Sequence, residues 1–166
     1  MRKTLFAIAA LLASTVAVEA AQTDAVSVDR KQVSASAARK MVDACLAFAE
    51  AHHILVGVAV VGIDGVLIDF HAMQGGGPTM AETAILKAKT AAHWQRPTST
   101  LEKDVLTQRN VASVWINDFP KAGALPIIID DQFAGAIGIG GAQMQEECAQ
   151  AGMDAVIPRQ SASAQR

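Results

Sequence analysis

The chain has 166 residues, a formal net charge of −2 at pH 7 and 51% hydrophobic residues. This length suits one domain, and the near-neutral charge excludes the basic surface of a nucleic-acid-binding protein. With 18% charged residues and only two cysteines, the chain belongs neither to the disordered class nor to the disulfide scaffolds. Thirty-three alanines supply much of the hydrophobic fraction, so we expect a thin core.

The first twenty residues have the pattern of a secretion signal. Arg2 and Lys3 form a positive n-region, residues 5–18 form an apolar run, and Val18-Glu19-Ala20 is a small-residue cleavage sequence. A retained membrane anchor is the alternative, but it needs about 20 apolar residues and Glu19 ends this run earlier. We therefore expect cleavage between Ala20 and Ala21, and a periplasmic or secreted protein without a membrane span.

The mature chain is expected to contain one folded domain. Residues 21–33 are polar and lack periodicity, which predicts a flexible leader, and residues 158–166 are expected to form a flexible tail. Residues 34–157 form the predicted domain between them.

Residues 34–96 predict a helix, a β-hairpin and a second helix. Ser34 is a candidate N-cap, and apolar residues follow it at helical spacing up to position 52. Two strands at residues 56–62 and 66–72 flank a turn, with Ile68 and Phe70 expected on one face of the second strand. After the glycine-rich residues 74–78, the capping-box sequence Thr79-x-x-Glu82 predicts a helix that ends before residue 97.

Residues 98–157 again predict helices that flank strands. A second capping box, Ser99-x-x-Glu102, predicts a short helix to about residue 108. Strands are predicted at residues 112–116, 125–129 and 133–139, and residues 142–151 predict a last helix ended by Gly152. The members expected on one face of that helix are Met144, Cys148 and Ala151. This order of elements predicts an α+β fold on an antiparallel sheet.

Five ordered sequence blocks carry a family resemblance. They are residues 58–67, 87–92, 96–98, 123–127 and 135–141, the last followed by Gln145-Glu146-Glu147. Together they resemble the GlcG/HbpS family over about residues 34 to 157, a domain also found fused to corrinoid adenosyltransferases as the PduO C-terminal domain. The resemblance implies a profilin-like α/β/α sandwich with about five strands in a central antiparallel sheet. It also implies homo-oligomers and haem binding, sometimes with haem degradation.

His93 is the first candidate for a haem-iron ligand. It ends the second helix, where Lys89, His93 and Arg96 fall on one face and could supply an imidazole and two cations for the propionates. The alternative needs no ligand, because cations near the C-terminus of a helix complement its dipole.

His71 is the second candidate, and Asp69 on the same strand face could fix the tautomer of its imidazole. A solvated strand face is the alternative. Met73 could offer a thioether, Gly76 lies in a loop that permits close approach to a flat ligand, and the haem is expected between residues 71–77 and 87–96. The predicted cofactor-binding residues are thus His93, His71, Lys89, Arg96, Met73, Gly76 and Lys87.

The other histidines and the cysteines have less specific interpretations. His52 is expected to be a hydrogen-bonded core residue, and His53 is expected to face solvent. Cys45 and Cys148 lie on apolar helix faces, where buried free thiols are favoured. A disulfide is the alternative, because in profilin-like folds the terminal helices pack on the same sheet face and an exported protein meets an oxidising compartment.

The residues and the resemblance predict an exported haem- or tetrapyrrole-binding protein that sequesters, transfers or slowly degrades haem. Two alternatives stay open: an enzyme that acts on a small metabolite in the same cleft without haem, and an oligomeric accessory protein. The glycine-rich strings lack the endings of a phosphate loop or a dinucleotide fingerprint, and no Gly-x-Ser-x-Gly sequence is present. These motifs therefore support neither nucleotide binding nor serine hydrolase chemistry.

Overall fold

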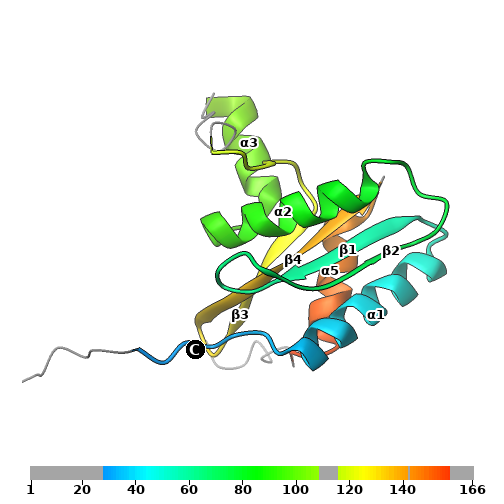
Figure 1. The fold of residues 1–166 in the computed structure, drawn as a ribbon. Helices are drawn as coiled ribbons and strands as arrows, with labels where there is room; N and C mark the ends of the chain where they lie inside the picture. Colours follow the sequence, from blue (N-terminus) through cyan, green and yellow to red (C-terminus); the bar gives the residue numbers. More distant parts are fainter. Residues whose placement is uncertain (1–27, 109–115, 142, 158–166) are drawn as a thin grey trace, which may run out of the picture.

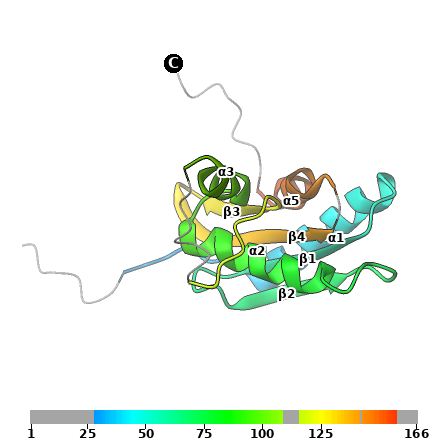
Figure 2. The same ribbon diagram turned by 90° about the horizontal axis from the view of Figure 1, so that it is seen from above.

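The computed structural model describes residues 28–108, 116–141 and 143–157. Helices α1 (Ala35–Ala51) and α5 (Gln145–Asp154) cover one face of a β-sheet, and α2 (Met80–Trp94) covers the other (Figures 1 and 2). Helix α3 (Thr98–Gln108) follows α2 and contacts both it and the sheet edge. The predicted α+β class and the α/β/α layers are confirmed.

The described residues contribute four strands to this sheet, in the order β2-β1-β4-β3. They are β1 (Val56–Val61), β2 (Leu67–Ala72), β3 (Ala124–Ile129) and β4 (Gln132–Gly141), and each neighbouring pair is antiparallel. Both predicted hairpins, β1–β2 and β3–β4, are present. The strand predicted at residues 112–116 lies outside the described residues except for Ile116, which is in a turn.

The two faces of the sheet carry different side chains because residues alternate along a strand. Branched residues of β1 and β4 pack against α1 and α5, and Ala59, Val61 and Ala136 pack against the alanines of α2. Helix α2 approaches very closely, since a Cβ on Gly138 would lie 2.4 Å from the backbone nitrogen of Ala88. The alanine content therefore reflects a close helix–sheet contact as much as a thin core.

Only one of the three predicted helix-capping interactions forms. The Ser34 hydroxyl accepts the N–H of Ala37 at 3.2 Å, as predicted for an N-cap. Thr79 makes no side-chain cap hydrogen bond, so the first capping box is wrong. The second is also wrong, because α3 begins at Thr98 and the Glu102 carboxylate binds Lys121 and the N–H of Ala122 instead.

Three details of the strands and the last helix differ from the predictions. A bulge shifts the β1–β2 register between Val60 and Val61, so Ile68 packs beneath α1 and α5 whereas Phe70 packs beneath α2. Gly152 lies inside α5 and does not end it; a Cβ there would lie 2.7 Å from the carbonyl oxygen of Met41, so the glycine permits the close contact between α5 and α1. Met144 is the N-cap of α5 rather than part of its apolar face.

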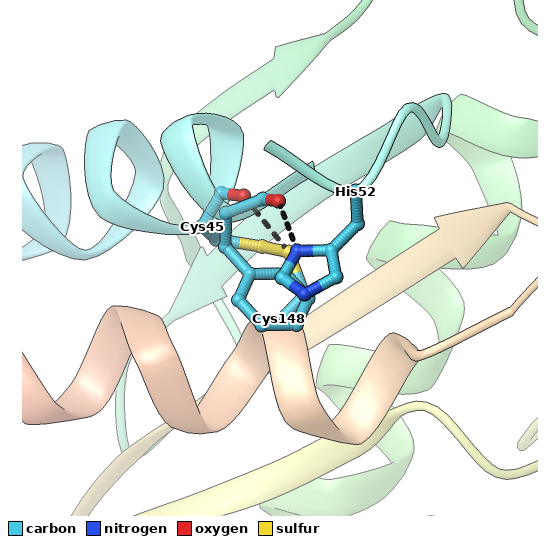
Figure 3. The surroundings of a disulfide bond; sticks show 4 residues. Cys45, His52 and Cys148 are labelled. Carbon is cyan, nitrogen blue, oxygen red and sulfur yellow. Dashed lines mark hydrogen bonds between the residues drawn. A yellow bond between two sulfur atoms is a disulfide. The ribbon is translucent and has the colours of Figure 1, made fainter. Parts of the chain in front are cut away.

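A disulfide joins Cys45 of α1 to Cys148 of α5, with 4.8 Å between the Cα atoms (Figure 3). The favoured interpretation of two free thiols is therefore wrong. The physical reason is the packing of α1 directly against α5, which brings the two buried side chains within bonding distance. His52 is also not a core residue: it is exposed at the C-cap of α1, its Nδ1–H donates to Phe48 O at 2.8 Å, and its ring stacks on that of Phe48.

Candidate functional site

His93 is hydrogen-bonded to a buried carboxylate. Its Nδ1 lies 2.7 Å from Oδ1 of Asp118, whose side chain is 2% exposed, and the other Asp118 oxygen accepts the indole N–H of Trp94 at 2.6 Å. The backbone N–H of Phe119 donates to Thr90 Oγ1 at 2.7 Å, which holds the Asp118 segment on α2. We call His93, Asp118 and Trp94 the histidine site.

The Asp118 contact determines which nitrogen of His93 is available to a ligand. A carboxylate only accepts, so in the neutral imidazole the proton is on Nδ1 and the lone pair is on Nε2. The side chain of His93 is 49% exposed. Metal-ligating histidines commonly have this arrangement, because a carboxylate on the far nitrogen orients the ring and raises its basicity.

The surroundings of His93 Nε2 are open and partly apolar. A Cβ added to Gly65, in the β1–β2 turn, would lie 3.7 Å from Nε2, so the turn borders the imidazole without covering it. The next two residues, Val66 and Leu67, are large exposed hydrophobics, and so is Ile116, two residues before Asp118. These exposed apolar residues are near in the chain to Gly65 and Asp118, which border His93, and are therefore candidates for contact with a flat apolar ligand.

The predicted row of cations is only partly available. Lys89 is exposed and forms no ion pair with any residue that the structure describes. Arg96 lies beyond the end of α2 and is paired with Asp104 at 3.1 Å. One cation, Lys89, thus remains beside His93 for a carboxylate of a ligand.

His71 and Met73 lie on the opposite side of the sheet from His93. His71 is exposed and is the cross-strand partner of Val58, whose side chain faces α1 and α5. Met73 packs against the hydrophobic core between the sheet and these two helices. Asp69 does not orient His71, since its carboxylate is paired with Arg39 of α1 at 2.9 Å. The structure therefore does not bring the two predicted iron ligands together, and their roles in binding stay predictions.

A second feature is a cleft of about 1070 Å³ beside the first half of α2. We call it the Lys87 cleft. Its walls come from the glycine loop, the start of α2, the segment before β3 and the start of α5. The residues that line it include Gly76, Met80, Lys87, Gly123, Gln145 and Glu146. Of the predicted cofactor residues, Lys87 and Gly76 line this cleft and His93, His71, Lys89, Arg96 and Met73 do not.

Lys87 is a buried cation, 3% exposed. Its Nζ donates to the carbonyl of Ile139 at 3.2 Å and to Oε1 of Gln145 at 2.5 Å, both neutral acceptors. Burial and, to a lesser degree, the charge of Lys121 lower the pKa of Lys87 to about 8, although Glu102 and Glu146 act in the opposite direction. No carboxylate in the described part of the chain forms a salt bridge with it.

Gly123 makes room for the Lys87 ammonium. It has φ +131°, and a Cβ there would lie 2.9 Å from Lys87 Nζ and 2.9 Å from Ile139 O. Its N–H and that of Ser99 donate to Oε1 of Glu146, at 3.4 Å and 3.1 Å, which holds the start of α5 against this segment. A glycine before β3 is thus required for the position of Lys87.

A metal site made of side chains alone is absent from the described residues, where no three His, Cys, Asp or Glu groups come together. An iron bound here would need other ligands, such as those of a tetrapyrrole, with one side chain completing its coordination. The histidine site fits that requirement, because it offers one oriented imidazole. The described residues also contain no helix with the length and hydrophobicity needed to cross a membrane.

Three residues of these two sites are not predicted from the sequence as site residues: Asp118, His53 and Gln145. Asp118 is 25 residues from His93, and no local spacing links the two. His53 is exposed as expected but also lines the Lys87 cleft, and Gln145 at the start of α5 accepts a hydrogen bond from Lys87, 58 residues earlier in the chain. These relations depend on tertiary packing, so no sequence signal short of the fold could have found them.

A sequence profile described as haem-degrading protein HbpS-like matches residues 33–154. The chain belongs to the HbpS-like family. The recognition made from the five sequence blocks is therefore confirmed. No curated protein matches the chain.

Several solved structures share the fold of this HbpS-like chain. A double mutant of Streptomyces reticuli HbpS has a TM-score of 0.73 and 28% identity, covering 87% of this chain and 97% of that one. Klebsiella pneumoniae protein ORFY has a TM-score of 0.75 and 20% identity, with coverages of 80% and 96%. PduOC in complex with haem has a TM-score of 0.70 and 20% identity, with coverages of 76% and 96%. At 20% identity, the last two establish the fold alone.

Proposed function

We propose that this HbpS-like protein is exported, binds haem with His93 as the iron ligand, and sequesters the haem or passes it to a partner. Family membership and the haem complex of PduOC support haem as the ligand. The observation that carries the proposal is the hydrogen bond of 2.7 Å from His93 Nδ1 to Asp118, which leaves Nε2 free at a partly exposed position.

Each neighbour of His93 has a defined task in this proposal. Asp118 holds the imidazole in one tautomer, and Trp94 satisfies the second oxygen of that carboxylate. The Lys89 ammonium pairs with one haem propionate, and exposed Val66 and Leu67 offer apolar contact to the macrocycle. Haem bound here would supply iron-centred redox and oxygen chemistry.

Because the proposed iron ligand is half exposed, the site suits haem that is bound and then exchanged rather than haem that is held permanently in the interior of the protein. We propose that another copy of this chain covers the exposed face of the haem, in line with the homo-oligomers that the family resemblance implies. Degradation of the haem is the further activity that the family description suggests. It would need oxygen and electrons at the iron, and it can be followed as loss of the Soret band under reducing conditions.

The proposed export rests on two independent features. Residues 1–20 have the three-part pattern of a cleavable signal. The Cys45–Cys148 disulfide suits an oxidising compartment, since structural disulfides are rare in the cytosol. Together they support a periplasmic or secreted location.

The proposal is tested by titrating the mature protein with hemin and reading the Soret band. We expect His93→Ala to shift the Soret maximum and to weaken affinity by about tenfold or more. His71→Ala is the matched control, because it removes an exposed histidine from the opposite face and should leave the titration unchanged. An unchanged spectrum in His93→Ala would refute the assignment, and loss of binding in His53→Ala would move the haem to the Lys87 cleft.

A further inference from the structure

The Lys87 cleft has no part in the proposed haem site and contains an uncommon combination of groups. Its wall holds a buried amine that lacks a counter-ion among the described residues, next to a volume of about 1070 Å³. Ligand sites in proteins typically have volumes of about 300–1,000 Å³, with mostly apolar walls and a few directed polar groups. A buried charge without a partner is costly, so its presence calls for a chemical reason.

The hydrogen bonds of Lys87 suit the neutral amine as well as the ammonium. A neutral amine has two N–H bonds and one lone pair, and Nζ has two acceptors, Ile139 O and Gln145 Oε1. When both N–H bonds are used in this way, the lone pair occupies the remaining direction. Since Lys87 also lines the cleft, a small electrophile could approach Nζ from the cleft side.

Two features of the surroundings favour the deprotonated amine. Lys87 is desolvated, and the Lys121 ammonium acts on it from the same cleft wall. Desolvation and a neighbouring cation are the two usual means by which proteins activate a lysine as a nucleophile toward carbonyl compounds.

We propose that the Lys87 cleft binds a small aldehyde by reversible formation of an imine at Lys87 Nζ. The lone pair of Nζ forms a bond to the carbonyl carbon, and one proton passes from the nitrogen to the carbonyl oxygen to give a carbinolamine. The hydroxyl then takes up the second nitrogen proton and leaves as water while the C=N bond forms. One amine and one aldehyde thus give one imine and one water, with no oxidant or reductant required.

The charges and walls of the cleft select the class of carbonyl compound. Lys121 is already paired with Glu102, and Glu146 and Glu147 bring negative charge to the lining. Among the described residues that line the cleft, an oxo acid would therefore meet no lysine or arginine free of an ion pair other than the lysine that it consumes. The other walls carry apolar side chains, which suit a hydrocarbon chain. These residues are Ile54, Leu55, Met80, Phe119 and Met144. An uncharged aldehyde with an apolar chain fits this lining best.

The experiment uses the mature, disulfide-bonded protein with hexanal as the probe and sodium cyanoborohydride to trap the imine. Peptide mapping by mass spectrometry compares Lys87 with the exposed Lys89 in the same molecules near neutral pH. We expect labelling of Lys87 to exceed that of Lys89 by about tenfold or more. Labelling of exposed lysines with none at Lys87 would overturn the proposal, and this comparison needs no variant.

Further arms separate the possible explanations. Lys87→Arg should lose the label, whereas the control Lys89→Arg should keep it at Lys87. Pyruvate, trapped in the same way, should label Lys87 less than hexanal does, and the reverse order would overturn the assignment to uncharged aldehydes. His93→Ala should label like the wild type, so the outcome is independent of whether the haem proposal holds.

Discussion

Cys45 and Cys148 stand 103 residues apart in the chain, and a disulfide between them ties the first described helix to the last. Because α1 and α5 lie side by side on one face of the sheet, this bond closes a loop that contains the whole sheet and α2. It therefore restrains nearly the entire unfolded domain rather than a local turn.

The first prediction concerns this disulfide. The double variant Cys45→Ala/Cys148→Ala should lower the free energy of unfolding by about 2–4 kcal/mol, mainly because its unfolded chain is less restrained. Urea unfolding of the wild type and the variant measures the difference. Adding a reductant should destabilise the wild type and leave the double variant unchanged. Equal midpoints for both proteins would contradict a formed disulfide.

The second prediction concerns the pH dependence of stability due to Lys87. Its pKa is about 8 in the folded protein and 10.5 ordinarily, so between these pH values the unfolded chain binds more protons than the folded one. Stability should therefore rise as pH increases through this window, by about 2 kcal/mol after allowance for solvent screening at the cleft. Urea unfolding at several pH values measures the slope.

Lys87→Met should remove this pH-dependent gain, since the uncharged side chain carries no titrating proton. Lys89→Met is the matched control on an exposed position of the same helix, and it should retain the slope of the wild type. If Lys87→Met and the wild type had the same slope between pH 8 and 10.5, burial of the amine would not be the cause.

The third prediction concerns processing and assembly. The exported protein should begin at Ala21 and should elute as a homo-oligomer. Intact mass measures the first property, and light scattering at micromolar concentrations measures the second. A mature protein that retained residues 1–20 would refute the cleavage site, and a mass of one chain at every concentration would refute the oligomer.

Local patterns in the sequence predicted most of the fold. The helical stripe after Ser34 and the strand and turn composition of both hairpins depend on neighbouring residues, and these elements are present as predicted. Tertiary contacts overrode local signals elsewhere. Glu102 does not close a capping box, because its carboxylate binds Lys121 and the N–H of Ala122 instead. A bulge between β1 and β2 places Ile68 and Phe70 on opposite faces of the sheet.

The sites were less predictable than the fold for the same reason. His93 was recognised from its position at the end of a helix, but its partner Asp118 follows after 25 residues. Lys87 was recognised as a cation near a ligand, but its burial depends on the contact between α2 and the end of β4. The disulfide likewise depends on which helices share a face.

The last prediction concerns Asp118 as the positioning residue for His93. Asp118→Ala should weaken hemin affinity by about 10–100-fold while the Soret band still indicates a histidine ligand, because Nε2 remains but its ring is no longer oriented. The hemin titration measures affinity, and the Soret maximum reports the ligand. Asp118→Asn keeps an acceptor oxygen for His93 Nδ1–H and should restore part of the affinity, which a merely structural role of the carboxylate would not predict.

Trp94→Phe is the control for packing at this site. It removes the N–H that binds the second oxygen of Asp118 and keeps an aromatic ring at the end of α2, so affinity should fall less than in Asp118→Ala. Near-UV circular dichroism should show that each variant is folded before its titration is compared. If Asp118→Ala bound hemin as the wild type does, the carboxylate would not act through His93, and the haem would belong elsewhere on the molecule.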